Sequence, residues 1–175
     1  MSNTAVFCIT KSRSQTQTII ERLNLSGFVY SEISVLMPET DSNHDIGHIK
    51  ASKAPEGTAT GAATGGVAGG IFGLLAGIGA IVIPGVGPLV AAGPIMAALS
   101  GAAVGAATGG LVGGLIGLGI PEIEAKIYEE KLKTGNYLIS VHALDDEEVL
   151  SAKQIFESED AESISTTSQV AVPAH

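Results

Sequence analysis

Few side chains in this chain could support chemistry, and they are widely spaced. Cys8 and His142 are far apart in the sequence, and Cys8 sits in an apolar run, which indicates a packed thiol rather than a nucleophile. His44 and His48 would share one face of a helix, as some metal sites require, but Gly47 interrupts that segment. We therefore expect no catalytic residue, no metal site and no cofactor, and a protein that is not an enzyme.

Two further polar features have structural explanations. The acidic run Asp145–Glu148 is typical of a helix N-terminus, where the helix dipole favours carboxylates. His142 alternates with Ile139 and Val141 in a strand pattern, so we expect it to face away from the core. A small-molecule site on an exposed sheet face near His142 is the alternative that this placement leaves open. The glycines lack the lysine of a phosphate-binding loop and the spacing of a dinucleotide fingerprint.

The dominant feature is the stretch 57–121, which contains no charged residue and holds twenty of the 23 glycines. Two runs within it keep a four-residue glycine period, and residues four apart share one face of a helix. The pattern predicts two helices with small-residue ridges, joined by a turn. The ridge residues are Gly61, Gly65, Gly69, Gly73, Gly77, Gly101, Gly105, Gly109, Gly113 and Gly117. The turn residues are Pro84, Gly85, Gly87, Pro88 and Pro94.

The two glycine runs predict an antiparallel hairpin centred near Leu89, in which Gly61 faces Gly117 and Gly69 faces Gly109. Each interior glycine costs a helix about 1 kcal/mol relative to alanine, so close packing must offset that cost. Small residues four apart permit such close approach between helices. We therefore expect self-association through these ridges and a homo-oligomer.

Each arm of the hairpin, 57–82 and 94–119, is long enough to cross a bilayer. We expect the hairpin to insert in the cytoplasmic membrane, with membrane lipid as a partner, and the flanking lysines predict that both termini lie in the cytoplasm. A soluble homo-oligomer, closed or filamentous, with the hairpins as its buried core, is the alternative. A switch between the two states stays open. The aliphatic periodicity disfavours a disordered linker.

Composition limits the remaining functions. The net charge of −9 at pH 7, without a basic patch, argues against nucleic-acid binding. The single cysteine excludes an internal disulfide, and the first residues show no signal-peptide pattern. Neither feature identifies a protein partner.

The flanking segments carry ordinary helix and strand signals. Strands are predicted at 5–9, 28–37, 137–143 and 161–167, and helices at about 12–25, 121–134 and 145–158. Ile123, Ile127, Tyr128 and Leu132 are expected to form the inner face of the second helix. The first and third strands are the most apolar, so we expect them at the centre of the sheet and the polar last strand at its edge.

These elements predict an α+β fold. The expected arrangement is a ferredoxin-like βαββαβ domain with a long glycine-rich α-helical hairpin inserted between the second and third strands. It divides the chain into the first half of that domain at 1–38, a polar connector at 39–56, the hairpin at 57–120, the second half at 121–167 and a flexible tail at 168–175.

Several sequence segments resemble a bacterial family labelled general stress or heat- or low-temperature-induced protein. They are Lys53-Ala54-Pro55-Glu56-Gly57, Ile83-Pro84-Gly85-Val86-Gly87-Pro88, Ala91-Ala92-Gly93-Pro94-Ile95-Met96-Ala97, Gly119-Ile120-Pro121-Glu122, Glu124-Ala125-Lys126 and Ser140-Val141-His142. The resemblance implies a small αβ domain with a glycine-rich hydrophobic middle, a role in stress and membrane association. It carries no catalytic residues. The connector 39–49 and the tail after Thr167 match least.

Overall fold

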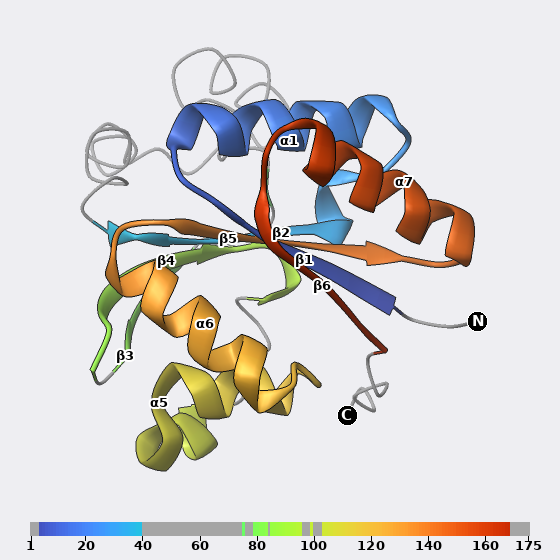
Figure 1. The fold of residues 1–175 in the computed structure, drawn as a ribbon. Coiled ribbons are helices and arrows are strands. Elements are labelled where there is room, and N and C mark those ends of the chain that lie inside the picture. The colour runs from blue at the N-terminus through green and yellow to red at the C-terminus, as the bar shows by residue number, and fades with distance from the viewer. Residues whose placement is uncertain are drawn as a thin grey trace, which may run out of the picture.

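A computed structural model of the chain describes residues 4–39, 75, 79–83, 85–95, 99 and 103–168, with the backbone alone for 103–109. These residues form one antiparallel sheet of six strands in the order β3-β4-β2-β5-β1-β6, together with four α-helices (Figure 1). The strands are β1 Thr4–Thr10, β2 Ile33–Pro38, β3 Gly79–Ile83, β4 Gly87–Ala92, β5 Tyr137–Ala143 and β6 Glu162–Ser168. The helices are α1 Arg13–Leu25, α5 Ala103–Gly117, α6 Glu122–Lys133 and α7 Asp146–Ser158, and a short 3₁₀ turn covers Tyr30–Glu32.

The predicted flanking helices and the strands at 5–9, 137–143 and 161–167 are confirmed, because their local signals act as expected, whereas the strand predicted at 28–37 begins only at Ile33, after a 3₁₀ turn at Tyr30–Glu32. The Ser12 hydroxyl caps α1 by accepting a hydrogen bond from the Gln15 amide at 3.1 Å, and Gly27 follows the helix at φ +107°. A carboxylate oxygen of Asp145 caps α7 by accepting from the Glu148 amide at 2.9 Å. The apolar strands β1 and β5 lie inside the sheet, and the polar β6 forms an edge.

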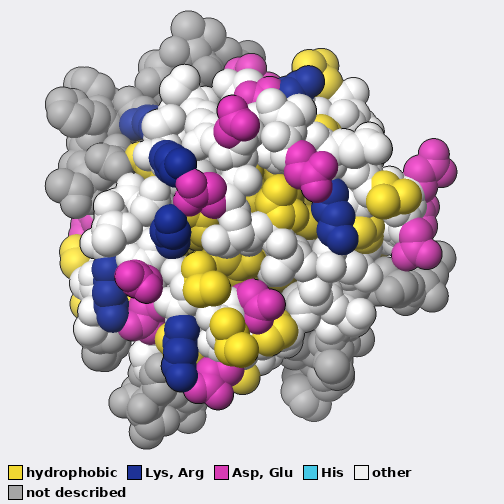
Figure 2. Space-filling model, viewed as in Figure 1, with side chains coloured by type: hydrophobic (Ala, Val, Ile, Leu, Met, Phe, Trp, Pro, Cys, Tyr) yellow, Lys and Arg dark blue, Asp and Glu magenta, His cyan; other side chains and the backbone are white. Residues whose placement is uncertain are grey.

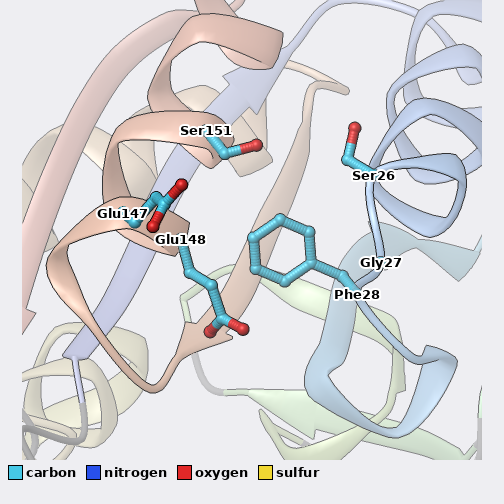
Figure 3. Close-up of a pocket in the computed structure, with 6 residues that line it drawn as sticks. All are labelled: Ser26, Gly27, Phe28, Glu147, Glu148 and Ser151. Atoms are coloured by element: carbon cyan, nitrogen blue, oxygen red, sulfur yellow. The ribbon is translucent and has the colours of Figure 1, made fainter.

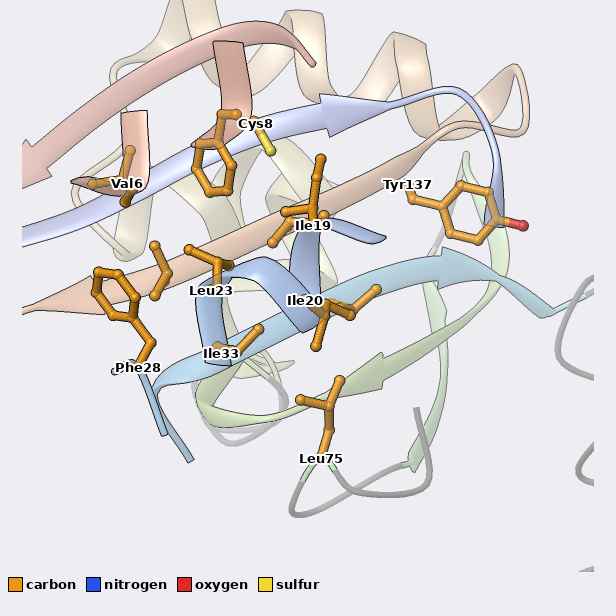
Figure 4. Close-up of a cluster of buried hydrophobic side chains, with 14 of the residues drawn as sticks. Val6, Cys8, Ile19, Ile20, Leu23, Phe28, Ile33, Leu75 and Tyr137 are labelled. Atoms are coloured by element: carbon orange, nitrogen blue, oxygen red, sulfur yellow. The ribbon is translucent and has the colours of Figure 1, made fainter. Parts of the chain in front are cut away.

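One face of the sheet is covered by α1 and α7 (Figure 1). Ile19, Ile20 and Leu23 of α1 are fully buried there against Val6 and other strand residues (Figure 4). Complete burial of such a side chain contributes about 1.5–3 kcal/mol, so this face is a true core. Leu75, from the glycine-rich stretch, belongs to the same cluster.

The other face is covered by α5 and α6 (Figure 1). Leu111 and Leu115 of α5 and Tyr128 of α6 are fully buried against Phe7 and Leu138 of the sheet. Residues that alternate along β1 therefore point into two different cores, with Val6 and Cys8 on the α1 side and Phe7 on the α5 side. The sheet is a middle layer between two helical layers.

The predicted ferredoxin-like domain with an inserted helical hairpin is wrong. Part of the stretch assigned to the hairpin supplies β3 and β4, which extend the sheet beyond β2. The two predicted arms also contact opposite faces of the sheet, since Leu75 packs in the α1 core and Leu115 in the α5 core. The sheet therefore has six strands in the order given above, with helices on both faces.

Local chemistry explains why this segment forms strands. Ile81, Val82 and Ile83 are consecutive β-branched residues, which favour strands over helices. Gly85 and Gly87 have φ values of +86° and +101°, which glycine adopts without strain, and they connect β3 to β4. Gly93 ends β4 close to β2, because a Cβ at this position would lie 2.2 Å from the Ile33 carbonyl oxygen. The apolar residues that predicted a helix face also suit a half-buried strand at a sheet edge.

Candidate functional site

The predicted ridge residues fall into described and undescribed parts of the chain. Gly61, Gly65, Gly69, Gly73, Gly77 and Gly101 lie outside the described residues, and with them the expected facing of the two glycine runs. Gly105, Gly109, Gly113 and Gly117 lie in α5. α5 is interrupted at Gly110, whose φ of 61° and ψ of −153° are not helical. The second run therefore does not form one uninterrupted helical ridge.

The predicted turn residues lie around the β3–β4 hairpin and not between two helices. Gly85 and Gly87 form the connection, in which the Val86 amide donates to the Ile83 carbonyl at 3.1 Å. Pro88 is opposite Val82 in the β3–β4 ladder. Pro94 follows the close contact at Gly93, and Pro84 lies outside the described residues.

Two glycines of α5 differ in what surrounds them. A Cβ on Gly114 would lie 3.0 Å from Cδ2 of Leu99, so the small size of this residue is used for packing within the chain. A Cβ on Gly117 would have no atom within 4 Å among those compared, and its φ lies outside the left-handed region. Neither packing among the described residues nor backbone conformation accounts for glycine at position 117.

Apolar side chains are exposed beside Gly117, where α5 turns into α6. Ile116 is 43% exposed and Ile123 is 75% exposed. We call Ile116, Gly117 and Ile123 the α5–α6 corner. The predicted inner face of α6 is wrong at Ile123 and Ile127, because Ala125, Tyr128 and Leu132 are the residues that face the core. Figure 2 shows hydrophobic side chains at the surface in the lower part of the view, with charged side chains of both signs around them.

The alternative of an exposed sheet face near His142 does not fit the described fold. His142 shares a face with Leu138 and Ser140, as its alternation predicted, but those two residues are buried. The reason is that α5 and α6 cover this face, which the sequence did not indicate. Cys8 is also buried, and burial raises the pKa of its thiol well above the ordinary value. This thiol is therefore a poor nucleophile.

The edge strand β6 contains polar contacts that sequence reasoning missed. Ser163 has a φ of 52° at a bulge, where Ser163 and Ile164 together oppose Cys8 of β1. The Tyr128 hydroxyl donates to the Ser163 carbonyl at 2.9 Å and lies 2.6 Å from the Ser165 hydroxyl. Burial raises the pKa of Tyr128 to about 12, so this hydroxyl stays protonated at neutral pH. No local sequence signal marks the bulge.

The start of β6 is held by two lysines. Glu162 forms ion pairs with Lys11 at 2.5 Å and with Lys131 at 2.9 Å. Hydrogen bonds from Lys11 and then Lys131 lower the pKa of Glu162 to about 2. These two ion pairs link β6 to the end of β1 and to α6.

A pocket of about 240 Å³ lies between the end of α1 and the start of α7, and Phe28 projects into it (Figure 3). Its lining residues are Ser26, Gly27, Phe28, Glu147, Glu148 and Ser151. A Glu148 oxygen accepts from the Leu144 amide at 2.7 Å, so this carboxylate completes the N-terminal cap of α7. His142 is not among the lining residues, and the arrangement is explained by helix capping.

Comparison with protein families, curated proteins and solved structures found no match to this chain. Within residues 4–168, as far as they are described, no group of three or more potential ligands is placed to hold a metal ion. The helices in the described part of the chain all lack the combined length and apolar character needed to cross a bilayer.

Proposed function

We propose that this chain is a non-enzymatic, stress-associated protein whose copies assemble through its uncharged, glycine-rich middle. The observation that carries the proposal is Gly117, a helical glycine whose missing side chain is not needed within the described fold. The stress association rests on the sequence resemblance described above.

A glycine in a helix lowers helix stability unless another segment packs closely against it and offsets that loss. Because Gly117 is the last residue of α5, alanine there would strengthen the helix by less than the roughly 1 kcal/mol of an interior position, and it has room to fit. A neighbouring molecule that packs against the bare backbone would offset this loss. Ile116 and Ile123 add exposed apolar area beside it, as the centre of an interface requires.

The packing of α5 favours assembly between copies over insertion of both arms in the cytoplasmic membrane. Leu111 and Leu115 have no exposure and belong to the sheet core. If this arm moved into a bilayer, it would uncover Phe7 and Leu138, at a cost of about 1.5–3 kcal/mol for each large side chain. A membrane form, with both termini in the cytoplasm, would have to recover that cost.

Sedimentation velocity of Gly117→Leu and Gly117→Ala tests the proposal against the wild type. We expect the wild type to sediment as an oligomer. Leucine should shift the equilibrium strongly towards monomer, and alanine should do so weakly, because the added volume separates the two surfaces. Both variants should unfold at the wild-type denaturant concentration or above it. Gln154→Leu, which places a leucine on the exposed surface of α7, is the control and should leave oligomer size unchanged.

Three results would contradict this assignment. A wild type that remains monomeric at all concentrations would remove self-association altogether. If the expressed protein stays in the carbonate-washed membrane pellet until detergent is added, the membrane form would be favoured. If Gly117→Leu has the same oligomer size as the wild type, the interface does not lie at the α5–α6 corner.

A further inference from the structure

The edge strand β3 is uncharged and apolar along its whole length. Its sequence, Gly79-Ala80-Ile81-Val82-Ile83, contains no proline and no charged residue. Among the described strands it pairs only with β4, and Val82 is 78% exposed. A strand with these properties offers a row of backbone donors and acceptors to another strand.

The charge distribution permits two copies to pair there. The chain carries a net charge of −9 at pH 7, so two copies repel where their charged surfaces meet. β3, β4 and α5 carry no charged side chain. Two copies can therefore meet at β3 without placing like charges together, whereas a strongly basic partner would gain nothing at this edge.

We propose that β3 pairs with β3 of a second copy, antiparallel and centred on Ile81, so that one sheet continues through both molecules. In this register Ala80 of one copy faces Val82 of the other, and Gly79 faces Ile83. The inference rests on the proposed self-association and specifies the strand that carries it.

The position of α5 places this helix beside the proposed pairing. α5 contacts β3 on the side where Ile81 and Ile83 face the core. A two-fold axis through Ile81 brings the α5 helices of both copies to the same face of the continuous sheet. The small residues of α5 would then allow the two helices to approach closely.

Disulfide cross-linking tests the register directly, because only directly opposed residues are close enough. Opposed residues in an antiparallel pair lie about 4.5–5.5 Å apart and diagonal ones about 7–8 Å apart, whereas disulfides need less than about 7 Å. We would mix Ala80→Cys protein with Val82→Cys protein under mild oxidation. The mixture should give at least roughly five-fold more covalent dimer than either variant alone. Wild type, whose Cys8 is buried, controls for the native thiol.

A lysine at the edge provides the second test. Val82→Lys should shift the oligomer towards monomer, since it would place two like charges close together across the axis, and Leu150→Lys on exposed α7 should not. If the cysteine mixture gives no more dimer than the single variants, or Val82→Lys keeps the wild-type size, the β3 pairing is wrong. Persistence of the wild-type oligomer in that case would leave the proposed self-association standing, whereas a monomeric wild type would remove both. If a segment of the same chain covers β3, the cysteine mixture will also give no mixed dimer.

Discussion

The two edges of the sheet are built in opposite ways. β6 is polar, contains a bulge at Ser163 and begins at Glu162 between two lysines. β3 is apolar and uncharged, and its pairing with β4 shows no register shift. Proteins usually protect their edge strands with bulges, charges or coverage, because an open edge recruits other strands.

This difference indicates where copies of the chain can meet. The bulge and the ion pairs of β6 prevent a regular strand from docking there. The polar side chains of β6 stay hydrated. None of these devices is present on β3. Among the described residues, β3 is an unpaired edge beside an uncharged helix, and this contrast with β6 is the basis of the three predictions below.

The largest effect is expected from Gly93→Ala, which should detach β4 and β3 from the sheet. The new methyl group would lie 2.2 Å from the Ile33 carbonyl oxygen, and the φ of +85° is unfavourable for alanine. We expect a loss of about 3 kcal/mol or more in the free energy of unfolding, measured in urea.

Gly27→Ala is the matched control, since its φ is +107° but no atom would lie within 4 Å of the new Cβ. It should cost only about 1–2 kcal/mol, from backbone strain alone. If Gly93→Ala and Gly27→Ala lose the same free energy of unfolding, the close contact between Gly93 and β2 does not contribute to the loss.

An intermediate effect is expected from Tyr128→Phe at the other edge. The Ser163 carbonyl and the Ser165 hydroxyl would lose their partner, at a cost of about 1–2 kcal/mol. Hydrogen exchange should become faster in β6 and stay unchanged in β3. Faster exchange in both strands would mean that Tyr128 supports the whole sheet rather than the bulge.

The smallest effect concerns pH and Glu162. Its folded pKa of about 2 lies below the ordinary value of 4.5, so its contribution to stability is complete above pH 4.5 and is lost as pH falls towards 2. Because the carboxylate is exposed to solvent, the change should be small. Unfolding curves of wild type and Glu162→Gln should differ at pH 6 and converge near pH 2. A constant difference across this range would contradict the lysine pairing.

Local signals made the flanking segments predictable. Ser12, Asp145, Gly27 and Gly135 mark helix ends through capping or positive φ, and these depend on neighbours in sequence. The β6 bulge was not predictable, because it depends on Tyr128, which is distant in the chain.

The middle of the chain was misassigned for a different reason. Its glycine period and its run of β-branched residues favour different structures, and tertiary contacts decide between them. β2 takes β4 as its second neighbour, so the segment 79–92 joins the sheet. At the candidate site, Gly105, Gly109, Gly113 and Gly117 lie in a helix that is interrupted at Gly110, and the sequence did not separate an inward Gly114 from an outward Gly117.

Hydrogen exchange of β3 and β6 as a function of protein concentration tests the central claim most directly, because both edges are observed in one sample. If copies pair through β3, exchange in residues 79–83 should slow as concentration rises, exchange in residues 162–168 should not change, and Val82→Lys should abolish the slowing. Exchange in β3 that is independent of concentration while the oligomer forms, or slowing confined to β6, would contradict the account.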